Sequence, residues 1–546
     1  MPNWTPAFPL EDLPRGGAKL LKTDTHKLAL FRLEDGEVFA VDNACPHEGY
    51  PLVQGEVKGR VLTCAWHNFK FSLEDGTCLK GDEAVRHYAT RTNNGTIEVD
   101  LTAEEPAVAI EKAWQSLEEA VVENQTGRMA RDVVRLLHAG VPAVQVLAYG
   151  AALDARYSEY GTSHALPVAT DLIEYLNGDI EHDTLVIMQL MELVSEPNQR
   201  RPRQEWPEPI AATDFENELS QAIEDEHADR AIALVRGALA QGTDPGPALL
   251  RCASEHFLGF GHALIYSTKT LELLEHDDTH KDDIFSALTL RILSSTREDT
   301  LPPMAKWRRW VDEREFKAGT TPLDHVDELA QRLLDRKDKQ VEQDFAQLIS
   351  TSDPQQLVDV LVEAAAQRLL NFNPAVHEDW KTQDGWLFVT HPLTYAHAIR
   401  ESMQRSSNPA ILKNLIWCMA FIRRSHRLDL PEAVRPQPHD PTTPGDLIAA
   451  LAGHDPQIVD IAHACTGDIT GPLRSWILAG QATRPIYIAH QIKTARVALQ
   501  EDRADTPLLA AARFLSMPAT ERGIRAQVHD ATQLVIHGNL PRRLSS

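Results

Sequence analysis

Two cysteines and two histidines lie close together near the start of this 546-residue chain, within residues 45–67. They form the pattern C-x-H-x16-C-x-x-H, with Cys45 and His47 in the first pair and Cys64 and His67 in the second. Thiolate and imidazole groups are ligands of iron and zinc. The short spacing within each pair lets one loop present one ligand of each kind. The pattern therefore predicts two loops that meet at one metal centre.

Two kinds of metal centre suit this ligand set. A set of two cysteines and two histidines binds tetrahedral zinc, although zinc fingers normally carry the cysteine pair and the histidine pair separately. Alternatively, two thiolates hold one iron of a [2Fe–2S] cluster and two imidazoles hold the other. Neutral imidazoles lower the charge of such a cluster and raise its reduction potential. The interleaved order of the ligands favours the iron–sulfur cluster.

The stretches CPHEGYPL (45–52) and FSLEDGTCL (71–79) resemble the Rieske family, and the resemblance covers about residues 5–101. It implies that Cys45 and Cys64 bind one iron of a [2Fe–2S] cluster. It also implies that His47 and His67 bind the other iron and lie near the surface. Respiratory-chain members of the family have one further cysteine in each loop, and these form a bracing disulfide. This chain lacks both, as do ferredoxin-like and oxygenase-associated members.

Three residues next to the second histidine bear on the resemblance. Asn68 follows the second histidine, where the family commonly has glycine. Asparagine tolerates left-handed backbone angles better than most residues, so the turn can be kept. The resemblance implies that Trp66 and Phe69 shield the cluster.

The chain changes character after about residue 101. Before it, short apolar runs flank the turn-forming pairs at 35–36, 75–76 and 94–95, which indicates β-hairpins. After it, Ala, Leu, Glu and Gln recur at helical spacing, interrupted by proline-rich stretches at 195–214 and 430–446. We expect a multidomain α+β protein, with an all-β domain at 1–103 and a large all-α domain at 104–546.

Four helical segments of the second region align on a histidine. They begin at His164, His262, His391 and His490, and they agree at the second, fifth and tenth positions after it. We expect an internally duplicated domain with repeat units at about 108–196, 214–300, 320–430 and 445–540.

The tenth position holds Glu174, Glu272, Glu401 and Gln500 in the four segments. It lies about 15 Å along a helix from the histidine. A glutamate there is therefore expected to form an ion pair, cap a helix or orient a ligand, and not to bind the same metal.

The four histidines are candidate catalytic residues. Each opens a predicted apolar helix or lies early in it, so its side chain can reach a shared interior. Four converging imidazoles would suit non-haem iron or another divalent metal, or would act as acid–base groups around an aromatic substrate. Histidines at helix starts also commonly pack between helices or satisfy backbone groups, and this alternative stays open.

Two families of oxidase bear on the helical region. SEHFLGFGH (254–262) is similar to the iron-binding motif of Rieske oxygenases, but the flanking sequence lacks the strands of that fold. GFGHALIYSTKTLELLE (259–275) and FVTHPLTYAHAIRESM (388–403) resemble the questin oxidase-like family over about 110–540. That resemblance implies a Baeyer–Villiger-like ring-opening oxidation, and it carries over to His262 with Glu272 and to His391.

Composition excludes several classes of protein. A formal charge of −25 disfavours nucleic acid and anionic membranes as partners. Six scattered cysteines do not suggest a disulfide framework. We expect a cytoplasmic location, because the sequence shows neither a signal peptide nor an apolar run long enough for a membrane span. Neither a dinucleotide-binding fingerprint nor a phosphate-binding loop is present, so electrons from NAD(P)H would need a separate reductase or ferredoxin reductase.

These observations predict an oxidoreductase of the oxygenase type. In it a Rieske cluster passes electrons to a helical oxidase- or monooxygenase-like domain, which oxidises a small aromatic molecule with O2 and has room for a second non-haem metal. The alternative is a ferredoxin-type electron-transfer module or a redox sensor, whose helical domain only docks a partner.

Overall fold

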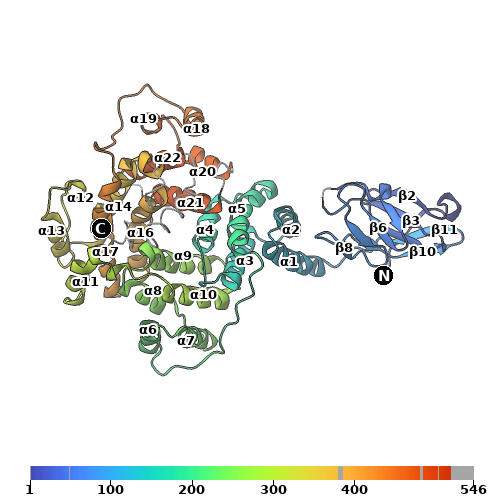
Figure 1. Cartoon of the computed structure of the whole chain (residues 1–546), viewed down its shortest axis with the longest axis horizontal. Helices are drawn as coiled ribbons and strands as arrows, with labels where there is room; N and C mark the ends of the chain where they lie inside the picture. The colour runs from blue at the N-terminus through green and yellow to red at the C-terminus, as the bar shows by residue number, and fades with distance from the viewer. Residues whose placement is uncertain (1, 48, 379–384, 480–483, 502, 518–546) are drawn as a thin grey trace, which may run out of the picture. The chain divides into compact units, whose positions relative to one another are not determined.

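The computed structural model describes the chain except for residues 1, 48, 379–384, 480–483, 502 and 518–546. The chain divides into two compact units. The first comprises residues up to 120 together with 125–140, and the second comprises 121–124 and the chain from 141 onward. The predicted order of a small all-β domain followed by a large helical region is confirmed (Figure 1).

The β domain consists of three small antiparallel sheets, in the strand orders β1-β11-β10, β2-β3-β4-β9 and β5-β6-β7-β8. The strands are β1 (Trp4–Pro9), β2 (Gly17–Lys22), β3 (Lys27–Arg32), β4 (Val38–Asp42), β5 (Glu56–Lys58), β6 (Val61–Thr63), β7 (Lys70–Ser72), β8 (Cys78–Lys80), β9 (His87–Tyr88), β10 (Thr90–Asn93) and β11 (Thr96–Asp100).

The three predicted hairpins are confirmed. They join β3 to β4, β7 to β8 and β10 to β11. Asn94 and Gly95 have φ values of 48° and 80°, the left-handed angles that a two-residue hairpin turn requires. These turns keep neighbouring strands in register, and so they hold the two loops that carry the cysteines and histidines.

Two helices complete the first unit. Helix α1 (Pro106–Val122) and helix α2 (Thr126–His138) follow the last strand, and nearly all of their residues group with the β domain. The first compact unit therefore extends beyond residue 103, where the composition of the sequence changes.

Among the described residues of the second unit, the regular elements are helices, joined by loops and a few isolated β-bridges. Its α-helices are α3 (Ala143–Tyr157), α4 (Ala165–Leu172), α5 (Ile180–Asn198), α6 (Phe215–Glu224), α7 (Ala228–Ala240), α8 (Gly246–Glu255), α9 (His262–His276), α10 (Lys281–Leu293), α11 (Ala305–Asp312), α12 (Val326–Leu334), α13 (Val341–Leu348), α14 (Pro354–Asn371), α15 (Pro374–Glu378), α16 (Trp386–Arg405), α17 (Lys413–Ser425), α18 (Pro444–Ala452), α19 (Ile458–His463), α20 (Thr470–Leu478), α21 (Pro485–Gln500) and α22 (Thr506–Leu515).

Helices α4, α9, α16 and α21 form a closed ring at the centre of this unit. In the ring α4 packs on α9, α9 on α16, α16 on α21 and α21 on α4 (Figure 1). Each is also the middle member of a packed group of three helices, which are α3–α5, α8–α10, α14 with α16 and α17, and α20–α22. Each expected repeat segment contains one such group, and the internal duplication itself remains a prediction.

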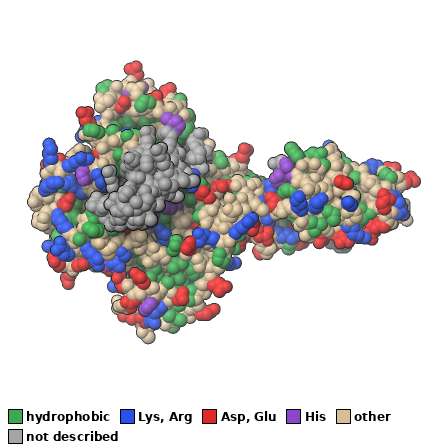
Figure 2. Space-filling view, viewed as in Figure 1, with side chains coloured by type: hydrophobic (Ala, Val, Ile, Leu, Met, Phe, Trp, Pro, Cys, Tyr) green, Lys and Arg blue, Asp and Glu red, His purple; other side chains and the backbone are tan. Residues whose placement is uncertain are grey.

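The surface carries charges of both signs. Figure 2 shows Lys and Arg side chains interspersed with Asp and Glu side chains over the visible face of the described residues. No described helix is both long and apolar enough to cross a membrane.

Candidate metal centres

The two loops of the β domain bring the predicted cluster ligands together. Cys45 and Cys64 are 4% and 1% exposed and belong to one hydrophobic core. His47 and His67 lie at the loop tips, with their Nδ1 atoms 3.1 Å apart. Two buried thiols and two imidazole nitrogens that face each other are the donors that a [2Fe–2S] cluster with mixed ligands requires. The residues present therefore fit such a cluster.

Short backbone hydrogen bonds shape both loops. The N–H of Gly49 donates to the carbonyl of Cys45 at 2.8 Å, and the N–H of Cys64 donates to the carbonyl of Phe69 at 2.8 Å. Asn68 has a φ of 60°, so the left-handed turn expected at this position is present. The substitution of glycine by asparagine therefore leaves the loop able to turn.

Aromatic rings lie against both loop histidines. The ring of Phe69 stacks on His47, with centroids 4.7 Å apart and planes 22° apart. Trp66 stacks on His67 at 5.1 Å and 13°. Trp66 is nevertheless 58% exposed, so it covers the histidine from the solvent side and is itself open to solvent, whereas Phe69 is half-buried.

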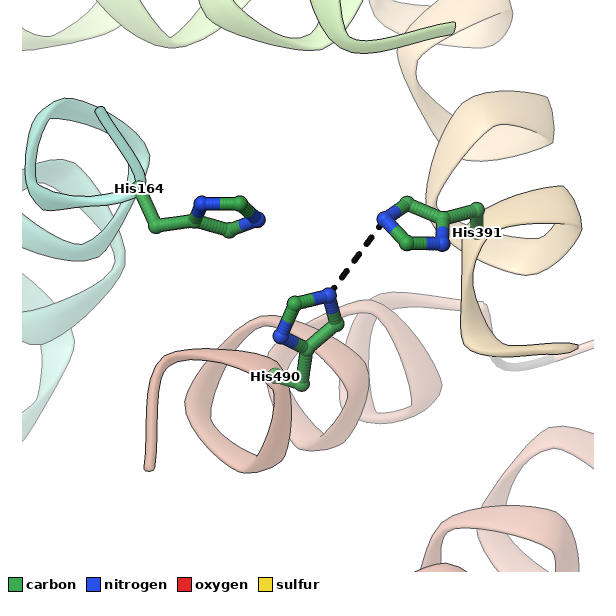
Figure 3. Close-up of side chains that lie close together, drawn as sticks. All are labelled: His164, His391 and His490. Atoms are coloured by element: carbon green, nitrogen blue, oxygen red, sulfur yellow. Dashed lines mark hydrogen bonds between the residues drawn. The ribbon is translucent and has the colours of Figure 1, made fainter. Parts of the chain in front are cut away.

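The four histidines of the helical unit lie together at the centre of the ring of helices. The Nε2 atom of His262 is 3.2 Å from that of His164 and 3.1 Å from that of His391. The Nε2 atoms of His391 and His490 are 3.3 Å apart (Figure 3). His164, His391 and His490 each offer a nitrogen within 4.8 Å of the other two. These three residues come from distant parts of the sequence, and His262 lies between two of them, beside His164 and His391.

Backbone carbonyls orient these rings. Nδ1 of His262 lies against the carbonyl of Gly259, and Nδ1 of His490 lies 2.9 Å from the carbonyl of Ile486. Nδ1 of His391 is 3.3 Å from the carbonyl of Phe388. A carbonyl can only accept, so Nδ1 carries the proton in each neutral ring. The Nε2 lone pairs consequently point toward the common centre, as in histidines that bind metals.

Burial keeps the rings neutral. It lowers the pKa of His391 to about 3, and it lowers the pKa values of His164, His262 and His490 well below the usual value. The nearby Lys493 ammonium lowers them further. Neutral imidazoles with facing lone pairs repel one another at these distances, and a cation between them would remove the repulsion.

An unusual loop sets the position of His262. Residues Gly259, Phe260 and Gly261 form the turn before α9, and all three have left-handed φ values, of 55°, 57° and 90°. The buried carboxylate of Glu298 accepts a hydrogen bond from the N–H of Phe260 at 3.1 Å. The loop therefore depends on Glu298 as well as on its glycines.

Burial raises the pKa of Glu298 to about 7. Because the folded protein then holds this proton at a pH where the unfolded chain has lost it, stability falls as pH rises from about 4.5 to about 7. We expect Glu298→Gln to remove a loss of stability of about 3 kcal/mol. In urea unfolding, the free energy of unfolding of the variant should rise relative to that of the wild type between about pH 5 and about pH 8. A difference in free energy that stays constant over this range would contradict the prediction.

A buried carboxylate also holds the turn before His164. Asp154 in α3 accepts hydrogen bonds from the Thr162 hydroxyl at 2.8 Å and from the N–H of Ser163 at 2.7 Å. Asn198 at the end of α5 donates to the same carboxylate at 3.2 Å. His164 follows directly, so these bonds set where α4 begins.

A layer of ion pairs lies further along the ring of helices. Arg496 pairs with Asp171 at 2.7 Å, with Glu174 at 3.0 Å and with Glu272. Lys269 pairs with Asp171 at 2.8 Å and with Glu272 at 3.0 Å. Glu174 and Glu272 are two of the glutamates at the tenth position, and their expected role in ion pairs is confirmed. Arg496 could not be found from the sequence, because it does not lie at one of the positions that the four segments share.

Lys493 is a second residue that the sequence analysis missed. It lies one turn after His490, it is 2% exposed, and its Nζ has no hydrogen-bond partner among the described residues. Burial lowers its pKa to about 7. It lines a cavity of about 10 Å³, the size of one water molecule, together with Asp171, Thr268 and His397. The interior near the histidines therefore holds a buried amine whose Nζ can donate to a bound ligand.

Three other histidines of the helical unit have different surroundings. His256 bonds to Asp299 at 3.1 Å and to Glu224 at 2.9 Å. His397 bonds to Glu501 at 2.8 Å. His276 is exposed at the end of α9.

Comparison with known proteins bears on the first unit. The Rieske [2Fe-2S] domain family matches residues 3–92. A ferredoxin component of naphthalene 1,2-dioxygenase/salicylate 5-hydroxylase systems from Ralstonia is 34% identical over 94 residues, which are 17% of this chain and 89% of that protein. Cholesterol 7-desaturase from Hemicentrotus pulcherrimus is 40% identical over 80 residues, 14% of this chain, and the chain spans only 17% of its length.

Among solved structures, the ferredoxin of Sphingomonas yanoikuyae B1 is similar to the same region. It is 22% identical, with a TM-score of 0.18, and the match covers 18% of this chain and all of that one. Each of these relatives and the solved structure covers less than a fifth of this chain. The ferredoxin component is matched over nearly its whole length. The chain therefore belongs to the Rieske [2Fe–2S] family through residues 3–92.

Proposed function

We propose that the chain is an oxidoreductase in which the Rieske domain passes electrons to the helical unit, where a small aromatic molecule is oxidised with O2. Cys45 and Cys64 are the proposed ligands of one iron, and His47 and His67 those of the other. A separate NAD(P)H-dependent reductase or ferredoxin reductase supplies the electrons. The observation that carries the proposal is the meeting of four neutral imidazoles in the helical unit.

His164, His262, His391 and His490 are the proposed ligands of a second, non-haem metal. Metal–nitrogen bonds of about 2.1 Å separate neighbouring ligand atoms by about 3.0–3.4 Å in octahedral or tetrahedral sites. The three Nε2–Nε2 distances between neighbouring rings, 3.1, 3.2 and 3.3 Å, fall in this interval. Imidazole ligands suit iron, copper, nickel and zinc, and iron among these serves oxygen chemistry.

The residues around the histidines support an aromatic substrate. The rings of Phe260 and Phe388 contact each other at 5.6 Å and are both half-buried. The ring of Phe260 lies 6.3 Å from that of His391. Flat apolar faces beside the cluster would bind an aromatic ring by stacking or edge contacts. The resemblance of 259–275 and 388–403 to the questin oxidase-like family points to the same class of substrate.

The chain's own residues have separate tasks in this proposal. When bound, the [2Fe–2S] cluster supplies single electrons and the second metal supplies a site for O2 activation. The carbonyls behind His262, His391 and His490 keep their Nε2 atoms unprotonated and directed inward. Burial of the cluster of histidines excludes bulk water. The Nζ of Lys493 offers a donor to a polar group bound beside them.

Metal analysis of the full-length protein tests the proposal. We expect wild-type protein to hold about two irons in the cluster and roughly one further metal ion. His262→Ala should lose the further metal and keep the cluster absorbance. His276→Ala is a matched control, because His276 ends the same helix and is exposed, and it should keep both metals.

The reciprocal variant separates the two centres. Cys45→Ser should lose the cluster and keep the further metal. A wild-type protein with two irons and no second metal would contradict the metal site and favour the electron-transfer module. Turnover of aromatic substrates with a reductase and O2 then tests the oxidase activity directly, and it should be lost in both His262→Ala and Cys45→Ser.

A further inference from the structure

Helix α2 contacts the loop that carries His47, although it follows the matched Rieske region by more than thirty residues. Arg131 lies in the middle of α2, within the same compact unit as the β domain. Its Nη1 donates a hydrogen bond to the backbone carbonyl of His47 at 3.0 Å. An element outside the family's own domain therefore touches a proposed cluster ligand.

A carboxylate fixes the guanidinium of Arg131 in this position. Its Nε donates to Glu83 Oε2 at 3.0 Å, and its Nη2 lies 2.9 Å from the same oxygen. Arg135, one turn later in α2, pairs with the other oxygen of Glu83. The side chain of Glu83 is only 10% exposed and that of Arg131 28%. The pair is therefore partly desolvated, and solvent screens it less than a surface ion pair.

The Glu83 segment reaches His47 by a second route. Gly81 packs so closely on Phe69 that an added Cβ would lie 2.4 Å from the ring. Phe69 in turn stacks on the ring of His47. The loop with His47 is thus held from its carbonyl by α2 and from its ring by Phe69. The chain lacks the extra loop cysteines that form a brace in respiratory-type members.

An arginine near a cluster acts through charge as well as through shape. Its guanidinium remains protonated at all physiological pH values. Reduction adds one negative charge to a cluster, and a fixed positive charge nearby stabilises the reduced form. Net charge and hydrogen bonding are among the properties that set the potentials of iron–sulfur centres.

We infer that Arg131 is a positioning residue for the cluster, and that it ties α2 to the His47 loop and raises the reduction potential. The inference rests on the proposed role of His47 as a ligand, and it is independent of the second metal. Loss of the cluster signal in the wild type would contradict that role itself. A normal cluster whose reduction potential does not change when Arg131 is replaced would contradict only the inference.

The test is redox titration of the full chain, followed by visible absorbance or circular dichroism. Arg131→Gln should lower the midpoint potential and speed the loss of the cluster in the presence of a chelator. Arg131→Lys keeps the charge but not the planar fork, so it should keep more of the potential than Arg131→Gln. Arg135→Gln is the matched control. It removes another positive charge that pairs with Glu83, but Arg135 makes no hydrogen bond to His47. The shift of the midpoint potential in Arg135→Gln should therefore be smaller.

Two results would overturn the inference. One is an Arg131→Gln potential equal to that of the wild type, and the other is an equal shift in Arg131→Gln and Arg135→Gln. If Arg131→Gln does not retain a cluster, Arg131→Lys decides, because it keeps the positive charge without the planar fork and should hold the cluster at a potential below that of the wild type. An unchanged or higher potential in Arg131→Lys would then overturn the inference.

Discussion

Replacing Gly261 by alanine should destabilise the helical unit by about 2–5 kcal/mol and weaken binding of the proposed second metal about 10–100-fold. Gly261 has a φ of 90°, and an added Cβ would lie 2.4 Å from Cγ of Tyr395. Tyr395 is 1% exposed and its hydroxyl donates to Asn414 at 2.6 Å, so it has little freedom to move. His262 follows directly, and a shift of the turn would displace its Nε2. Urea unfolding and metal titration measure the two effects.

Gly178→Ala is the control for backbone strain. Gly178 has a φ of 87°, and a Cβ added there would meet no atom within 4 Å. Gly178→Ala should therefore lower the free energy of unfolding by only about 1–2 kcal/mol and leave the affinity for the proposed metal unchanged. Equal losses in Gly178→Ala and Gly261→Ala would show that the contact with Tyr395 does not matter.

Replacing Arg496 by methionine should destabilise the helical unit by about 3–5 kcal/mol. The substitution leaves Asp171 and its neighbouring carboxylates without their main counter-charge, and the Arg496 side chain is only 4% exposed. Because unpaired buried carboxylates become easier to protonate, the loss should shrink as pH falls. Thermal unfolding followed by circular dichroism over a range of pH measures it.

Arg474→Met provides the comparison for Arg496→Met. Arg474 also pairs with Glu174, at 3.5 Å, but its side chain is 36% exposed. Pairs as exposed as this contribute about 0–1 kcal/mol. A loss from Arg496→Met as small as that from Arg474→Met would mean that solvent or Lys269 compensates the carboxylates.

The histidine anchors could be found in the sequence because four segments aligned on a histidine also agree at the second, fifth and tenth positions after it. His164 precedes the first residue of α4, and His262 is the first residue of α9. His391 and His490 lie within the second turn of α16 and α21. Their places relative to the helix starts differ, so the packing of the four helices into a ring brings the side chains together. The cysteine and histidine loops were legible for a similar reason, since their spacing is local.

Contacts between distant segments could not be read in this way. Arg496 meets Glu272 across 224 residues, and only the packing of the helices brings them together. Arg131 reaches His47 across 84 residues, from a helix that composition assigns to the other region. The left-handed φ of Phe260 was also unforeseen, because a bulky residue rarely adopts it.

The positions of the ligands along the chain have a consequence for biosynthesis. The proposed cluster ligands are all translated by residue 67, whereas the four helical histidines are complete only at His490, which is 423 residues later (490 − 67). At synthesis rates of about 5–20 residues per second, this delay is roughly 20–80 s. The β domain can therefore emerge, fold and receive iron and sulfide while the histidine ring does not yet exist. The two centres would be filled in sequence, and the cell could supply each from a different source.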